Sequence, residues 1–263
     1  MTTTQPGIRR RLGTTRNLLP ATRRIAFLCL AFLTQSCKDA TSPTLITVSG
    51  SVTLNDQWSR QLVDFSGVNV NIDGVSTQAI TDVTGAWHID GVPAGVHIIT
   101  YQKTTFGIFR LADQQISSSP ATIRNVILAV TPWQQAVTDS VYLVNKAGTD
   151  YYVVDGHLSD PPPATAFVSS VIAFVGSSAS VSNDATSWKH FASTLDLTGK
   201  ATRFSISLSA SQLRATFSAP GRAYITAYLV PAICDGCGAR LVGDPSIFTN
   251  TGPHANVVPL TIN

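Results

Sequence analysis

The chain has 263 residues, of which 18 are Lys or Arg and 15 are Asp or Glu, so its formal net charge is +3 at pH 7. Six basic residues precede Ile25, and from Lys38 onward 12 basic and 15 acidic residues remain, a formal charge of −3. Nucleic-acid-binding proteins need a basic face, so this balance argues against nucleic acid as a partner. The acidic residues are all Asp, while Val, Thr and Ser are abundant. A composition with few helix formers and many strand formers favours β-structure.

An export signal is predicted at the N-terminus. Ile25–Leu33 is an apolar run preceded by Arg23 and Arg24. As a helix this run would rise about 13–14 Å, far less than the ~30 Å hydrocarbon core of a bilayer. A basic flank, a short apolar region and then small or polar residues are typical of a secretory signal.

The next residues, Thr34-Gln35-Ser36-Cys37, resemble a bacterial lipobox, in which a small residue precedes the lipidated cysteine. The match departs from the usual pattern at Thr34, because Leu33 lies one place too early. The resemblance implies a signal peptide at residues 1–37, lipidation of Cys37, a polar tether at 38–44 and anchoring to a membrane of the bacterial envelope. The alternative is a plain secretory signal in which Cys37 is incidental.

The clearest β-pattern of the first half is Thr81–Thr100. It contains short alternating runs and turn signals in the order Thr84-Gly85, Ala86–Ile89, Asp90-Gly91, Pro93–Gly95 and Val96–Ile99. Gly adopts the positive φ that tight turns need, and Pro fixes the backbone of the turn position that precedes the Gly. We therefore expect Asp90-Gly91 to end one strand and Pro93–Gly95 to turn into the next. Further strands are predicted at Ile46–Leu54, Val68–Ile72, Thr77–Thr81, Phe109–Ala112 and Ile123–Ala129.

Four segments of this half resemble the carboxypeptidase regulatory-like domain, a transthyretin-like β-sandwich. They are Val48–Val52, Ser66–Val70, Thr81–Trp87 and Gly91–His97. Their order and spacing fit the family over about residues 45–132, apart from a long insert at Asn55–Asp64. The resemblance implies a non-catalytic folding or binding module, with Trp87 at the buried aromatic position of the family.

A second β-sandwich is predicted at residues 138–263, after a connection at Pro132, a residue that cannot donate to a strand ladder. Its strands are expected at Ser140–Val144, Tyr151–Leu158, Phe167–Val175, Trp188–Leu195, Thr202–Leu208, Arg222–Leu229 and Val257–Ile262. Ala147-Gly148 predicts a turn, and Ser211–Phe217 is compatible with one helical turn. The predicted fold class is therefore all-β, with two antiparallel β-sandwich domains in tandem after a cleaved signal peptide. No family resemblance is found for the second domain.

Cys234-Asp235-Gly236-Cys237 is the one chemical motif of the second half. A zinc site needs two further ligands, and a redox pair is expected at a helix N-terminus. In an exported protein we predict a local disulfide between Cys234 and Cys237, which staples the loop tip more than the domain. Metal binding, redox activity and free thiols remain alternatives.

No catalytic residue, metal site or cofactor is predicted. The five His residues fall in unrelated contexts, and no nucleophile elbow, zinc-protease or phosphate-loop motif is present. Without Glu, a glycosidase-like carboxylate pair would need two Asp residues.

We therefore predict a non-catalytic envelope lipoprotein that acts as a binding or scaffolding module, with another envelope protein or a polysaccharide as its partner. The alternative is a carbohydrate-binding surface protein, in which Trp58 and Trp188 are the candidate ligand contacts. A sugar-binding site should show an exposed coplanar aromatic pair, whereas a scaffold should show an apolar patch or an open sheet edge.

Overall fold

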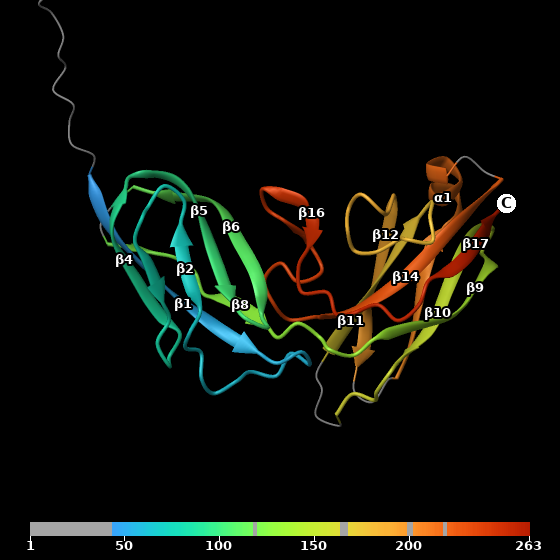
Figure 1. Cartoon of the computed structure of the whole chain (residues 1–263), viewed down its shortest axis with the longest axis horizontal. Coiled ribbons are helices and arrows are strands. Elements are labelled where there is room, and N and C mark those ends of the chain that lie inside the picture. Colours follow the sequence, from blue (N-terminus) through green and yellow to red (C-terminus); the bar gives the residue numbers. More distant parts are fainter. Residues whose placement is uncertain (1–43, 118–119, 164–167, 199–201, 218–219) are drawn as a thin grey trace, which may run out of the picture. The chain divides into compact units, whose positions relative to one another are not determined.

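The computed structural model describes residues 44–117, 120–163, 168–198, 202–217 and 220–263. Two sandwiches follow one another along the chain (Figure 1). One sheet of the first contains β4 (Ala86–Pro93), β1 (Leu45–Asn55), β7 (Ala121–Thr122) and β8 (Val126–Ala129). Its other sheet contains β3 (Gln78–Ile80), β2 (Asn69–Ile72), β5 (Gly95–Lys103) and β6 (Gly107–Ile116).

The second sandwich also has two main sheets. One contains β13 (Arg203–Ser209), β10 (Thr149–Leu158) and β9 (Ala136–Lys146). The other contains β12 (His190–Thr198), β11 (Val168–Gly176), β14 (Gly221–Pro231) and β17 (Val258–Ile262). A helix, α1 (Ala210–Phe217), follows β13, and a small hairpin of β15 (Arg240–Leu241) and β16 (Asp244–Phe248) follows β14. The predicted all-β fold is confirmed.

Each sandwich encloses a core of alternating residues, as period-2 side-chain geometry requires. The first core includes Val48, Trp87 and Tyr101, and Trp87 is only 4% exposed, so its interpretation as a core residue is confirmed. Strand β14 is buried on both faces. Its odd-numbered residues Ala223, Ile225, Ala227 and Leu229 join the main core, and Tyr228 and Val230 join a smaller cluster on the opposite face of the sheet.

Among the described strands, pairing is antiparallel except at β1, which pairs in parallel with β7 and β8. An isolated parallel bridge also joins Ala136 of β9 to His254. The prediction that Asp90-Gly91 ends a strand is wrong, because β4 continues to Pro93. Ile46 pairs with Val92 and Val48 with Ile89, so a single residue of β1, Thr47, opposes both Asp90 and Gly91. Gly91 has a φ of 76°, the left-handed conformation that glycine readily adopts in such a bulge. The turn signal therefore produces a β-bulge here, and Thr47 Oγ1 donates to Asp90 Oδ1 at 2.7 Å.

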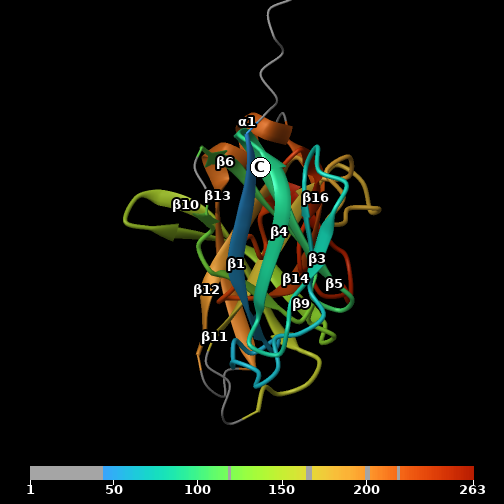
Figure 2. The same ribbon diagram turned by 90° about the vertical axis from the view of Figure 1, so that its left-hand side faces the viewer.

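The β9–β10 hairpin forms as predicted. Ala147 and Gly148 have φ values of 51° and 81°, and they connect Lys146 to its partner Thr149. Two positive φ values define a type I′ turn, whose twist matches that of the strands. The hairpin projects from the neighbouring strands (Figure 2).

Candidate functional site

The predicted lipidation site, Cys37, lies outside the described residues. No helix in the described part of the chain is long and apolar enough to cross a membrane.

The expectation that Trp58 is an exposed ligand contact is wrong, because Trp58 is only 3% exposed. Asp56 Oδ1 accepts hydrogen bonds from the backbone N–H groups of Trp58 and Arg60, both at 2.9 Å. This turn folds the insert back, and Leu62 N–H donates to Leu54 O at 2.8 Å. As a result Trp58 belongs to the core cluster of the second sandwich, not to a solvent-exposed loop.

Trp188 is also buried, with 8% exposure, so it cannot form the predicted exposed aromatic pair with Trp58. Its ring centroid lies 5.6 Å from that of Phe174 and 5.4 Å from that of Phe248. The guanidinium of Arg240 lies 4.8 Å from the Trp188 ring centroid, within cation–π range. Trp188 therefore belongs to the smaller cluster that also contains Tyr228 and Val230, on the face of the sheet opposite the main core.

Trp133 is the exposed indole of the chain, with 62% exposure, and the sequence interpretation overlooked it. Its backbone N–H donates to Gln57 Oε1 at 3.1 Å, so the insert of the first sandwich holds its backbone. The residue follows Pro132 at the connection between the two sandwiches, and it is exposed between two buried residues, Pro132 and Gln134. That position was the signal that could have identified it.

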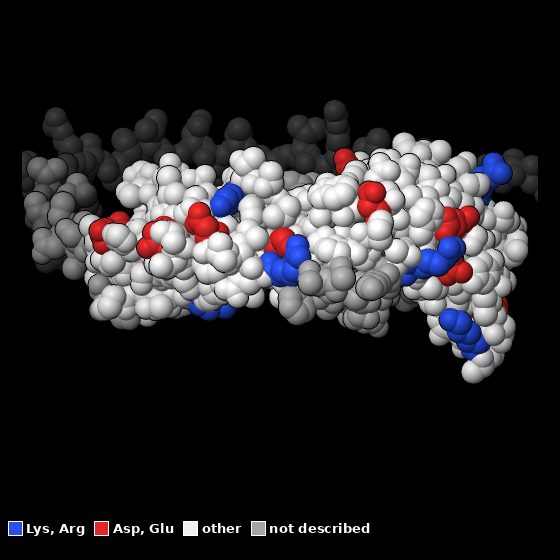
Figure 3. Space-filling model, turned by 90° about the horizontal axis from the view of Figure 1, so that it is seen from below, with Lys and Arg blue, Asp and Glu red and all other residues white. Residues whose placement is uncertain are grey.

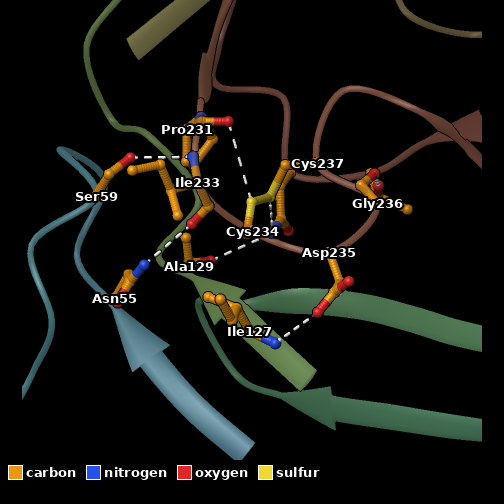
Figure 4. Close-up of a disulfide and its surroundings, with 12 residues drawn as sticks. Asn55, Ser59, Ile127, Ala129, Pro231, Ile233, Cys234, Asp235, Gly236 and Cys237 are labelled. Atoms are coloured by element: carbon orange, nitrogen blue, oxygen red, sulfur yellow. Dashed lines mark hydrogen bonds between the residues drawn. A yellow bond between two sulfur atoms is a disulfide. The ribbon is translucent and has the colours of Figure 1, made fainter. Parts of the chain in front are cut away.

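Cys234 and Cys237 are joined in a disulfide with a Cα–Cα distance of 5.6 Å. The loop they close contacts the first sandwich at several points (Figure 4). Asp235 N–H donates to Ile127 O, and Ile127 N–H donates to the Asp235 carboxylate, both at 2.7 Å. Asp235 therefore bonds both the N–H and the C=O group of Ile127 in β8, as a residue of a neighbouring strand would.

Other contacts hold the same loop, which we call the disulfide loop (residues 232–250). Asn55 Nδ2 donates to Ile233 O at 3.0 Å, and Ile233 N–H donates to Ser59 Oγ at 3.1 Å. Asn250 Nδ2 donates to Ala129 O at 3.2 Å. Arg124 forms an ion pair with Asp235 at 2.9 Å, and the Asp235 carboxylate raises the pKa of the Arg124 guanidinium. The disulfide itself closes only residues 234–237, the tip of this loop, and within that tip Asp235 makes the contacts with Ile127 and Arg124.

An open hollow of about 510 Å³ lies near the base of β9. Asp139 lies there between His157 and Arg203, with Asp139 Oδ1 to His157 Nδ1 at 2.8 Å and Asp139 Oδ2 to an Arg203 nitrogen at 3.2 Å. A histidine oriented by a carboxylate is one part of a hydrolytic site, which also needs a nucleophile in contact with the histidine. The described structure shows none there. Within the described residues, no group of three or more His, Cys or Asp side chains could hold a metal ion.

The free part of β9 is an open sheet edge. Asn256 covers the beginning of the strand, because its side chain accepts from Thr138 N–H at 2.9 Å and donates to Thr138 O at 2.8 Å. From Asp139 to Lys146 the strand pairs only with β10 among the described residues, and Tyr142 and Leu143 are 45% and 43% exposed. They point to opposite faces, since side chains alternate along a strand. We call Asp139–Lys146 the free edge of β9.

Charge is sparse on the face seen in Figure 3, where acidic and basic groups are interspersed. That face therefore presents no single-sign patch for a polyanion or polycation, in keeping with the formal charge of −3 after residue 37.

No family model matches the chain, and no curated protein matches it. Among solved structures, a candidate carbohydrate-binding protein from Bacteroides uniformis is 14% identical, with a TM-score of 0.30 over 82% of this chain and 98% of that one. A DUF3823 family protein from Bacteroides ovatus is 8% identical, with a TM-score of 0.30 over 84% and 100%. The major pilin SpaD from Corynebacterium diphtheriae is 10% identical, with a TM-score of 0.28 over 83% and 67%. Such low scores support no inference about function.

Proposed function

We propose that the protein is a non-catalytic bacterial envelope lipoprotein, anchored through Cys37, that acts as a protein-binding or scaffolding module. The proposal takes residues 1–37 as a signal peptide, 38–44 as a tether, 45–132 as a carboxypeptidase regulatory-like sandwich and 138–263 as a second sandwich. The observation that carries the binding role is the free edge of β9. Exposed strands with unpaired backbone groups and apolar side chains are docking sites for other strands.

The free edge is tested by photo-crosslinking in the producing bacterium. A photoreactive residue is placed at Leu143, and the matched control is Val83, which is exposed to 62% but lies in a turn outside the strands. We expect a discrete crosslinked product from Leu143 and none from Val83. Equal labelling at both positions, or none at Leu143, would contradict a docking role for β9.

The anchor is tested separately with the Cys37→Ser variant. We expect metabolic labelling with a radioactive fatty acid to disappear and the protein to move from the membrane to the soluble fraction. Labelling that persists in Cys37→Ser would rule out this residue as the lipid attachment site.

Carbohydrate binding is the second candidate function, and the exposed indole of Trp133 favours it, because aromatic faces stack on sugar rings. The test is affinity electrophoresis of residues 38–263 through gels that contain a panel of polysaccharides. We expect retardation by one glycan that is lost in Trp133→Ala and retained in Trp188→Phe, since Trp188 is buried. Migration that no glycan changes would exclude this function for that panel.

A further inference from the structure

The free edge of β9 is complementary to itself, and we propose that it pairs antiparallel with the same strand of a second copy of this chain. The inference deepens the proposed function and rests on β9 being the docking strand. It names the occupant of that strand.

The hairpin geometry fixes which backbone groups are available. A two-residue type I′ loop closes on a hydrogen-bonded pair, here Lys146 and Thr149, and hydrogen-bonded and non-bonded pairs then alternate along the ladder. Val141, Leu143 and Asn145 are therefore the residues whose N–H and C=O groups point away from β10. The pairing of β9 with β10 shifts register between Asp155 and Gly156. In the part of β9 that precedes Asp139, the residues whose backbone groups point away from β10 are therefore even-numbered. Thr138, whose N–H and C=O both bond Asn256, agrees with this assignment.

A two-fold antiparallel pairing must match outward groups with outward groups, which permits a register centred on Leu143. In that register Leu143 lies opposite the partner's Leu143, and Val141 lies opposite the partner's Asn145. Tyr142 faces the partner's Val144, an aromatic and β-branched pair of the kind that stabilises neighbouring strands. The exposed apolar side chains of one copy thus cover those of the other.

Charge complementarity favours a second copy of the chain as the partner of the free edge. Lys146 stands at the tip of the free edge and Asp139 at its base, and an antiparallel partner exchanges tip and base. Lys146 then lies opposite the partner's Ser140, next to the partner's Asp139, and no like charges face each other. Within one copy the Lys146 ammonium has weak partners, because its Nζ lies 3.4 Å from Ser207 Oγ and 6.0 Å from the Tyr151 ring centroid. Asp139 is bound by His157 and Arg203, so it brings an ordered carboxylate to the contact.

The register is tested by cysteine crosslinking of the chain from Lys38 onward, because residues 43–263 form one compact unit. Cα atoms of a hydrogen-bonded antiparallel pair are about 5.5 Å apart, within disulfide range. We expect Leu143→Cys to form a disulfide-linked dimer with itself. Asn145→Cys should do so only when mixed with Val141→Cys. Crosslinking of Asn145→Cys alone at an equal rate would overturn the register.

Sedimentation equilibrium tests the association itself. Leu143→Pro removes one outward N–H without removing a bond to β10, so we expect it to sediment as a monomer with an unchanged circular dichroism spectrum. The matched control Leu143→Thr keeps the N–H and should still dimerise. Lys146→Glu should raise the dissociation constant by about fivefold, from the energy of cross-strand charge pairs.

The outcome also separates this inference from the proposed function. A chain that stays monomeric at every concentration, while Leu143 crosslinks to another protein in the bacterium, would overturn the second copy as occupant and leave β9 as a docking strand. If Leu143 crosslinks to nothing and the chain is monomeric, both fail.

Discussion

Trp87 shows how single residues fix the first core. Its ring packs edge-on against Tyr101, with centroids 6.0 Å apart and an interplanar angle of 72°. Gly50 lies opposite on β1, where an added Cβ would come within 2.6 Å of the Trp87 ring. Glycine is therefore required at position 50 by space, because close packing leaves no room for even one methyl group.

We expect Trp87→Ala to lower the free energy of unfolding by about 3–5 kcal/mol, the usual cost of removing a large buried aromatic side chain. Trp133→Ala serves as the control and should change it by less than about 0.5 kcal/mol, because Trp133 is on the surface. Equilibrium urea unfolding of the two variants measures both values. Similar losses in the two variants would contradict the assignment of Trp87 to the core.

Asp82 links the stability of the first sandwich to pH. Its Oδ1 accepts from Thr84 Oγ1 at 2.7 Å, Thr84 N–H at 2.8 Å and Ala86 N–H at 3.0 Å. These hydrogen bonds, that of the Thr84 side chain first, lower the pKa of Asp82 below its usual value of 3.8. The unfolded chain therefore takes up the proton first, and stability that is present above pH 3.8 is lost as the pH falls toward the folded pKa.

In Asp82→Ala this contribution is absent, so the fall in stability as the pH drops below about 4 should be shallower than in the parent chain. Thermal unfolding over that pH range, followed by circular dichroism, measures the slope. Parallel curves for the two chains would show that Asp82 does not contribute to the acid sensitivity.

At the scale of elements, the sequence located most strands because alternation and turn chemistry are local. The hairpin at Ala147-Gly148 is an example, since two adjacent residues determine both turn type and register. Local reasoning failed where a distant partner decides the outcome. The parallel pairing of β1 with β8 joins segments about 70 residues apart, and the bulge at Gly91 depends on the facing strand.

The same limit applies to the candidate site. Nothing within the insert reveals that Trp58 enters a core built from residues after 135, and nothing near Trp188 reveals that Phe248 covers it. Both aromatics therefore looked available in sequence. The free edge of β9 was also invisible, because strand order in a sheet is a property of the whole topology.

Loss of the Asp235 side chain should loosen the disulfide loop at one identifiable position. We expect Asp235→Ala to increase amide hydrogen exchange of Ile127, whose N–H donates to that carboxylate, by at least about tenfold, since a charge-assisted hydrogen bond contributes about 1.5–3 kcal/mol. Asp184→Ala, in another loop of the second sandwich where, among the described residues, the carboxylate bonds only Thr186, is the control and should leave Ile127 unchanged. Hydrogen exchange followed by NMR detects the difference, and equal protection of Ile127 in both variants would refute it.

At the scale of the whole molecule, Trp58 couples the two cores. It lies in an insert that begins at the end of β1, yet its side chain belongs to the cluster that contains Tyr152 and Val154. Leu62, in the same insert, packs instead against the first core. One loop thus contributes side chains to both sandwiches.

We expect Trp58→Ala to cost about 3–5 kcal/mol and to raise hydrogen exchange in β10, although the substituted residue precedes that strand by about 90 residues. Leu62→Ala should raise exchange in the first sandwich instead. A response of Trp58→Ala confined to β1–β8 would show that the indole does not stabilise the second core.

The burial of Trp58 also affects truncated forms of the protein. Cutting at Pro132 would leave the second half with a vacancy shaped for an indole, at a place where the intact protein has none. Apolar cavities of this kind stay dry and accept small aromatic molecules. Free indole added in solution should therefore fill the cavity in Trp58→Ala and restore its stability. The stability of that variant would then be set by the concentration of indole.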